Sequence, residues 1–314
     1  MLPAAVLALA TAGIAAAANG GFTPQFAHSP NTHHTNTAYY VILGFTGAIF
    51  VIVESALALF IWKYRSRGRA RTVEGFQLHG ATRLEIVWTV IPVVILAVIA
   101  TVIFIELPNI TGAPASAANP LEITVEGHQF YWQFDYPNGT RTINDLYVPV
   151  GQVVELKVVS ADVVHSWWIP QLNGKIQAIP GRTNHTWFRA DRAGTYYGQC
   201  AELCGPYHEA MKARVIAAPL DEYVVQREMA TEALGKNEFQ GVCATCHGMQ
   251  GQGGYGPALA NNSLLTQKSG LEAIVRNGRG LMPPVGNTWN DAQVNALVQY
   301  AKSKIFKGAS TSGG

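Results

Sequence analysis

All four cysteines of this 314-residue chain lie in two short segments whose residue types suit metal binding. The first segment reads Cys200-Ala-Glu202-Leu-Cys204-Gly-Pro-Tyr-His208-Glu-Ala-Met211 and offers thiolate, imidazole and thioether donors together. Such soft ligands suit copper better than calcium or magnesium. The second segment, Cys243-Ala-Thr-Cys246-His247, has the spacing that attaches a c-type haem. Two redox-active metals on one chain indicate electron transfer.

The first segment admits three interpretations besides copper. A disulfide between Cys200 and Cys204 would fit an oxidising compartment, and a Cys2His2 zinc site would use the same residue types. Both leave Met211 without a role, and chance clustering is the third alternative. His165, in Val164-His165-Ser-Trp, could add an imidazole from a second loop. Donors that come from two loops at one end of a β-sandwich resemble the cupredoxin arrangement.

The second segment places two thiols one helical turn apart, so both can form thioethers with a haem while His247 lies beneath the iron. A thioredoxin-like redox pair is the main alternative, but the adjacent histidine argues against it. Met282 is the expected sixth ligand, and a core methionine is the alternative; Met249 is too close to the attachment site. Gly280-Leu-Met282-Pro-Pro284 and Gly256-Pro257-Ala-Leu259 resemble loops of bacterial class I cytochromes c. That resemblance implies that the Pro257 carbonyl orients His247.

The first third of the chain predicts a membrane anchor. Residues 38–62 and 86–105 are two apolar runs, each long enough to cross a bilayer, and two buried helices of a soluble protein are the alternative. Charged residues make up only 13% of the chain, about half the usual share. The loop between the runs is basic, whereas residues 1–37 contain no Lys or Arg. Its basic residues are Lys63, Arg65, Arg67, Arg69, Arg71 and Arg83. Positive loops stay in the cytoplasm, so both termini should lie outside.

The remaining segments indicate a leader and two soluble domains. Residues 1–18 look like the apolar part of a signal peptide, with a retained hydrophobic segment as the alternative. His28, His33 and His34 are expected in a solvated loop, and metal binding is the alternative. Strands are predicted at 121–125, 129–136, 153–159, 183–189 and 194–198, which favours a β-sandwich or barrel. The tryptophans and tyrosines near 128–136 are expected in the core and surface of the sandwich, and a binding box is the alternative. Helices are predicted at 221–234 and after the cap Asn290. A net charge of +2 without a basic stripe argues against nucleic acid as a partner.

Further motifs resemble subunit II of the cytochrome c oxidases, in the caa3 type that carries a fused C-terminal cytochrome c. They are Glu85-Ile-Val-Trp88-Thr-Val-Ile-Pro92, Gly127-His-Gln-Phe-Tyr-Trp-Gln-Phe-Asp-Tyr136, Val164-His165-Ser-Trp, Ala178-Ile-Pro-Gly-Arg182 and Tyr196-Tyr-Gly-Gln-Cys200. The resemblance implies a two-helix transmembrane hairpin (38–107), a cupredoxin-like all-β sandwich (119–218) and a small all-α class I cytochrome c domain (222–308).

The same resemblance assigns roles to individual residues. Cys200 and Cys204 would bridge two coppers of a copper A centre. Its other ligands would be His165, His208, Met211 and the backbone carbonyl of Glu202. The Glu202 carboxylate resembles a magnesium ligand at the boundary with subunit I. Glu85 matches a glutamate at the mouth of a proton channel, and a solvated carboxylate at the helix end is the alternative. Phe130 stands where the family usually has a tryptophan that takes electrons from a docked cytochrome c, and a fused donor would make that loss understandable.

The implied function is electron entry into a terminal haem-copper oxidase. Electrons would pass from haem c to copper A and then to subunit I, where oxygen is reduced to water with proton translocation. The implied partners are subunits I and III, the lipid of a bacterial inner membrane, and a cytochrome c or bc complex as donor. A copper subunit of a nitric oxide reductase and a membrane-anchored copper chaperone stay open as alternatives. A quinol oxidase subunit II is disfavoured because that branch lacks the copper ligands.

Overall fold

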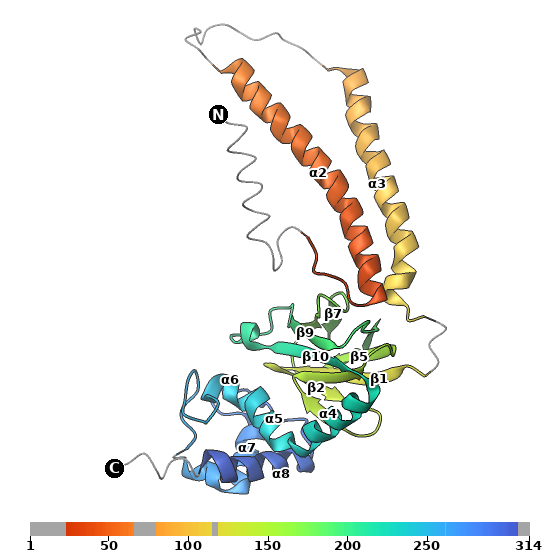
Figure 1. Cartoon of the computed structure of the whole chain (residues 1–314). Helices are drawn as coiled ribbons and strands as arrows, with labels where there is room; N and C mark the ends of the chain where they lie inside the picture. Colours follow the sequence, from red (N-terminus) through yellow and green to blue (C-terminus); the bar gives the residue numbers. More distant parts are fainter. Residues whose placement is uncertain (1–22, 66–79, 115–118, 261, 307–314) are drawn as a thin grey trace. The chain divides into compact units, whose positions relative to one another are not determined.

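The computed structural model describes residues 23–65, 80–114, 119–260 and 262–306 (Figure 1). The chain divides into two compact units, one made of residues 33–110 and the other of the segments before and after them. The predicted signal peptide, residues 1–18, lies outside the described residues, as does most of the basic loop.

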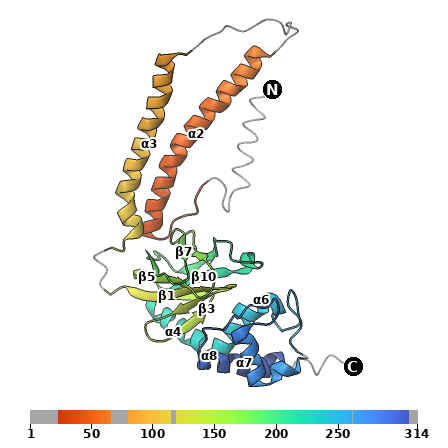
Figure 2. The same ribbon diagram turned by 180° about the vertical axis from the view of Figure 1, so that it is seen from behind.

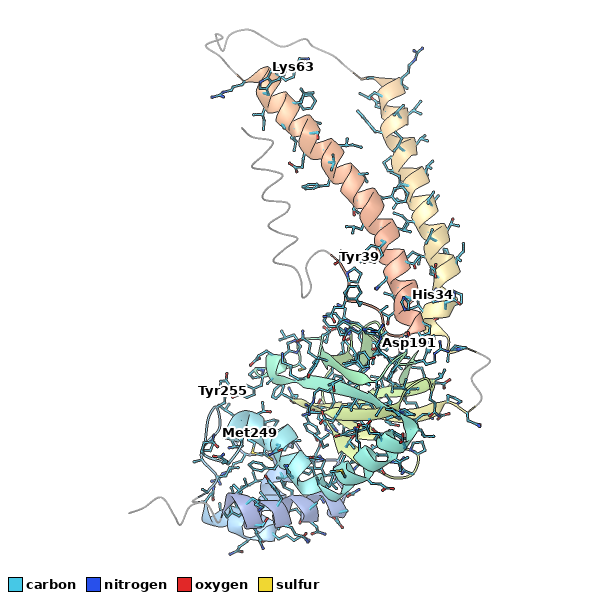
Figure 3. The ribbon with its side chains drawn as sticks, viewed as in Figure 1. His34, Tyr39, Lys63, Asp191, Met249 and Tyr255 are labelled. Atoms are coloured by element: carbon cyan, nitrogen blue, oxygen red, sulfur yellow. The ribbon has the colours of Figure 1, made fainter. Side chains whose placement is uncertain are left out.

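Two long helices form the unit of residues 33–110, namely α2 (Pro30–Tyr64) and α3 (Thr82–Thr111). They contain the two predicted apolar runs, and each is long and apolar enough to cross a bilayer. His34 Nδ1 lies 2.6 Å from Glu106 Oε2, which joins the helices near one end (Figure 3). The predicted loop is therefore wrong for His33 and His34. The helix already begins at Pro30, a residue type that suits the first helical turn.

The β domain confirms the predicted sandwich. A five-stranded sheet has the order β3-β2-β1-β5-β8, a three-stranded sheet has the order β4-β10-β9, and β6 pairs with β7. The strands are β1 (Leu121–His128), β2 (Tyr131–Asp135), β3 (Arg141–Ile143), β4 (Asp145–Pro149), β5 (Val154–Ser160), β6 (His165–Trp167), β7 (Ile176–Ala178), β8 (Asn184–Phe188), β9 (Gly194–Gln199) and β10 (Lys212–Ala218). Trp132 and Phe134 are fully buried in its core, as the aromatic run predicts, and Trp167 of β6 is buried beside them.

Short helices form the C-terminal domain, which lies beside β3 (Figure 2). They are α4 (Leu220–Glu232), α5 (Leu234–Glu238), the π-helix η2 (Phe239–Cys243), α6 (Ala244–His247), the 3-10 helix η3 (Ser263–Thr266), α7 (Lys268–Asn277), α8 (Asp291–Tyr300) and the π-helix η4 (Ala301–Ile305). The Asn290 side chain accepts a hydrogen bond from Gln293 N, and the Gln293 side chain accepts one from Asn290 N. The predicted cap is therefore confirmed as a capping box. The β domain and these helices belong to the same compact unit.

Candidate metal centres

The first cysteine segment is the loop that joins β9 to β10. Two backbone hydrogen bonds fix it. Cys200 N donates to Met211 O at 2.9 Å and closes the loop, and Ala201 N donates to Ser166 O at 2.9 Å. Because Ser166 lies in β6 next to His165, the second bond brings the loop against the strand that carries the distant imidazole.

Six potential donors converge at this loop. His165 Nδ1 lies 3.9 Å from Cys200 Sγ, which lies 4.0 Å from Cys204 Sγ and 3.2 Å from the Glu202 carbonyl oxygen. Cys204 Sγ in turn lies 3.5 Å from His208 Nδ1 and 3.8 Å from Met211 Sδ. The structure thus brings together all the residues expected to bind copper. Their sulfur and nitrogen atoms form a soft donor set that fits this metal.

The two thiols of this loop are not joined in a disulfide, and their pKa values are shifted in opposite directions. A hydrogen bond from the Cys204 thiol lowers the pKa of Cys200 far below its ordinary value, whereas the same contact raises the pKa of Cys204. The pair therefore loses its first proton readily, from Cys200, and its second only with difficulty. A second negative charge 4.0 Å from the first would be repelled unless a cation lay between them. The arrangement fits a metal that carries positive charge to both sulfurs.

Three residues support the donors without being donors themselves. Asp162 Oδ1 accepts a hydrogen bond from His165 Nε2 at 2.7 Å, which leaves Nδ1 facing the sulfurs. Burial lowers the pKa of His165, but its bonds to Asp162 and Cys200 outweigh this and raise it. Gln129 Nε2 donates to the Cys204 carbonyl. Gly127 leaves room for the imidazole, because a Cβ there would lie 2.8 Å from His165 Cδ2.

The second cysteine segment spans the end of η2 and the short helix α6. Cys243, Cys246 and His247 all line one cavity, and burial raises the pKa of both thiols, which therefore stay protonated. His247 Nδ1 lies 2.7 Å from the carbonyl oxygen of Pro257. This hydrogen bond leaves Nε2 available for iron. A Cβ at Gly256 would lie 2.6 Å from His247 Cε1, so the loop approaches the ring closely.

That cavity has a volume of about 670 Å³ and is mostly apolar. Met282 lines it from a separate loop, which two backbone hydrogen bonds between Arg279 and Met282 hold in a tight turn. Apolar walls with two thiols, an imidazole and a thioether fit a covalently attached haem. Met249 lines a different cavity and is 53% exposed, in keeping with its exclusion as a ligand (Figure 3).

The β domain contributes part of the haem cavity wall. Gln129, Phe130 and Tyr207 line it together with the helical domain's own residues. The Phe130 and Tyr207 rings meet edge to face with centroids 5.4 Å apart. Tyr207 also lies 5.1 Å from the ring of Tyr255, which is 73% exposed on the loop after α6 (Figure 3). Because Tyr207 precedes His208, the wall of one site is continuous with the ligand loop of the other.

Comparison with known proteins agrees with the division of the chain into a helical hairpin, a β domain and a C-terminal helical domain. The family model of the cytochrome c oxidase subunit II transmembrane domain matches residues 17–105, and that of its periplasmic domain matches residues 140–218. A model of cytochrome c oxidase, cbb3-type, subunit III matches residues 230–300. The helical region is thus similar to a cytochrome domain.

Named relatives are similar over most of the chain. Cytochrome c oxidase subunit 2 of Alkalihalophilus pseudofirmus is 36% identical over 289 residues, which cover 81% of this chain and 82% of the relative. The subunit 2 of a Bacillus species is 31% identical over 194 residues, 54% of each chain. The crystal structure of the periplasmic domain of subunit II from Bradyrhizobium japonicum is 34% identical, covers 37% of this chain and 97% of that domain, and gives a TM-score of 0.35. The chain therefore belongs to the cytochrome c oxidase subunit II family, as a membrane-anchored subunit with a periplasmic domain and a C-terminal cytochrome c domain.

Proposed function

We propose that this subunit receives electrons at a haem c, passes them to a dinuclear copper A centre and delivers them to subunit I of a haem-copper oxidase. There, oxygen would be reduced to water with proton translocation. The observation that carries the proposal is that residues of the copper domain line the haem cavity, so that both sites face the same aromatic contact.

The copper ligands are proposed from the convergence of their donor atoms. The copper pair would be held by the sulfurs of Cys200 and Cys204, with His165, His208, Met211 and the Glu202 carbonyl. When bound, the copper pair and the haem would each supply a one-electron carrier. The protein's contribution is to hold the donors rigidly through the β6 contact and the Asp162–His165 hydrogen bond.

The haem ligands are proposed from the cavity lining. Cys243 and Cys246 would form the thioethers, and His247 at the end of α6 and Met282 from a separate loop would bind iron. Phe130 would carry electrons out of the cavity towards the Cys204–His208 loop through its contact with Tyr207. A donor fused to the chain explains why the usual tryptophan is dispensable at this position.

The remaining assignments follow from family membership. We assign the hairpin to residues 38–107, the copper domain to 119–218 and the haem domain to 222–308, with both metal domains on the periplasmic side of a bacterial inner membrane. Subunits I and III would be its partners, with a cytochrome c or bc complex as donor. The Glu202 carboxylate, which accepts a hydrogen bond from Gln177 Nε2 at 3.4 Å, would face a magnesium ion at the subunit I boundary.

Two substitutions and one matched control test the proposal in the assembled oxidase, produced in a host that matures haem c. The native protein should hold one covalent haem and two mixed-valent coppers in this subunit, with oxygen and not nitric oxide as the preferred acceptor. Met282→Ala should abolish the sulfur-to-iron charge-transfer band and leave the copper resonance intact, whereas Met249→Ala should change neither signal. Cys204→Ser should remove the copper resonance alone. Zinc, a single labile copper or a cystine at Cys200 and Cys204 would contradict the proposal.

A further inference from the structure

Tyr131 of the copper domain belongs to the hydrophobic core of the haem domain. It begins β2, yet it is fully buried among residues of the helical domain, including Phe239, Trp289 and Leu297. Its neighbour Trp132 points into the sandwich core instead. Alternation along the strand therefore sends one aromatic ring into each domain.

The Tyr131 hydroxyl is bonded to two groups near the Met282 loop. It donates to the Val285 carbonyl oxygen at 2.6 Å and accepts from Trp289 Nε1 at 2.8 Å. Val285 lies three residues after Met282 and lines the haem cavity. The His128 ring stacks on the Tyr131 ring, with the two centroids 4.5 Å apart.

The copper domain is also bonded to the helix that carries the first haem-site cysteine. Asn144 Nδ2 donates to the Gly241 carbonyl oxygen at 2.9 Å, and Gly241 lies in η2, the helix that ends at Cys243. Arg141 of β3 donates to Gln293 of α8, whose Nε2 donates to Gln133 Oε1 at 3.3 Å. The copper domain is thus hydrogen-bonded to the loop that follows Met282, to the helix that carries Cys243 and to α8.

We propose that Tyr131 is a positioning residue for Met282, so that the copper domain holds the loop that supplies the sixth ligand of the haem iron. This inference rests on the proposed haem ligation. Removing the hydroxyl would leave the partly buried Val285 carbonyl and the buried Trp289 N–H without this partner. A loop that has lost this bond should release Met282 more easily.

The test is an alkaline titration of the ferric haem in the assembled oxidase, followed by the sulfur-to-iron charge-transfer band. Tyr131→Phe should lower the midpoint pH at which the band is lost by about one unit, a tenfold shift towards the released form. The copper resonance should not change. Tyr136→Phe is the matched control. Tyr136 is also buried, and its hydroxyl donates to Tyr147 O at 2.9 Å and accepts from Tyr147 N at 2.8 Å, all inside the copper domain. This variant should keep the native midpoint.

The outcomes separate the two proposals. A native protein without the sulfur-to-iron band refutes Met282 ligation itself. A native band together with the same midpoint in Tyr131→Phe, or an equal shift in Tyr136→Phe, refutes only the role of Tyr131. If Tyr131→Phe yields no haem-loaded protein, Trp289→Phe tests the same link from the other side. It removes the N–H that the hydroxyl accepts and should give a smaller shift in the same direction, and an unchanged midpoint there counts against the role of Tyr131.

Discussion

Asp162 fixes His165 by accepting a hydrogen bond from its Nε2 at 2.7 Å, while Nδ1 of the same ring faces the Cys200 sulfur 3.9 Å away. The carboxylate is itself held by the backbone N–H of Gln129 at 2.7 Å. One side chain therefore sets both the tautomer and the direction of the imidazole. Gln129 also bonds to the Cys204 carbonyl, so the two halves of the site share a support.

Asp162→Asn tests this support. The amide keeps the size of the side chain but loses the negative charge, and its orientation is no longer dictated by His165. A carboxylate that hydrogen-bonds to a metal-ligating histidine typically contributes about 10–100-fold to metal affinity. We expect copper to be lost at correspondingly lower chelator concentrations, as measured by competition with a copper chelator. Asp191→Asn, in another turn of the β domain, is the control and should leave copper retention unchanged. Equal retention by both variants would contradict the role of Asp162.

Gly256→Ala should disturb haem attachment. A Cβ at this position would lie 2.6 Å from His247 Cε1 and 2.7 Å from its Nδ1, which is closer than atoms can approach, so the imidazole or the loop must move. We expect a severalfold lower yield of haem-stained protein, together with a weakened His247–Pro257 hydrogen bond. Gly174→Ala is the control, because a Cβ there meets nothing within 4 Å. Full haem content in Gly256→Ala would show that the loop yields easily.

Phe130→Leu should slow electron transfer between the two sites. The shorter side chain cannot fill the gap beside Tyr207, where the two rings meet at an interplanar angle of 88°. We expect a severalfold lower rate when an electron is injected photochemically into the haem and copper reduction is followed optically. Phe130→Trp retains a ring and should keep most of the rate, whereas Phe26→Leu, at an 86% exposed position, should have no effect. An unchanged rate in Phe130→Leu would exclude this contact from the route.

The copper and haem segments could be recognised in the sequence because their donors are close together in the chain. Cys200 to Met211 span one loop, and Cys243 to His247 span about one helical turn. Cysteine, histidine and methionine at such spacing are uncommon, so few alternatives compete. His165 lies 35 residues before Cys200 and needed the family resemblance, because local spacing contains no information about which strands become neighbours.

The residues that support the copper donors were not predicted, for a different reason. An aspartate three residues before a histidine is an ordinary turn residue, and nothing but the fold shows that it faces the ring. The aromatic run near 128–136 was assigned to the sandwich as a whole. Trp132 and Phe134 lie in the sandwich core, and Tyr131 lies on the other face of the same strand. That the helical domain covers this face could not be predicted, because alternation indicates which face of a strand a residue occupies and not which domain covers it.

A buried acid should make the stability of the haem domain depend on pH. Glu238 at the end of α5 is fully buried, and burial raises its pKa from 4.5 to about 9, although Gln293 and Arg141 act in the opposite direction. Between these two values the folded chain keeps a proton that the unfolded chain releases. Stability associated with this group is therefore complete below the unfolded pKa and declines as pH rises towards 9.

Glu238→Gln removes the titration while keeping the size of the side chain. We expect the thermal midpoint of the haem domain, followed by haem absorbance in the full-length protein, to exceed the native value by several degrees at pH 8. At pH 5 the difference should shrink to about one degree or less, because the native carboxyl is then protonated as well. Glu228→Gln, at an exposed position of α4, should leave the pH profile unchanged. A gain that is equal at both pH values would mean that packing, and not the buried proton, accounts for the effect.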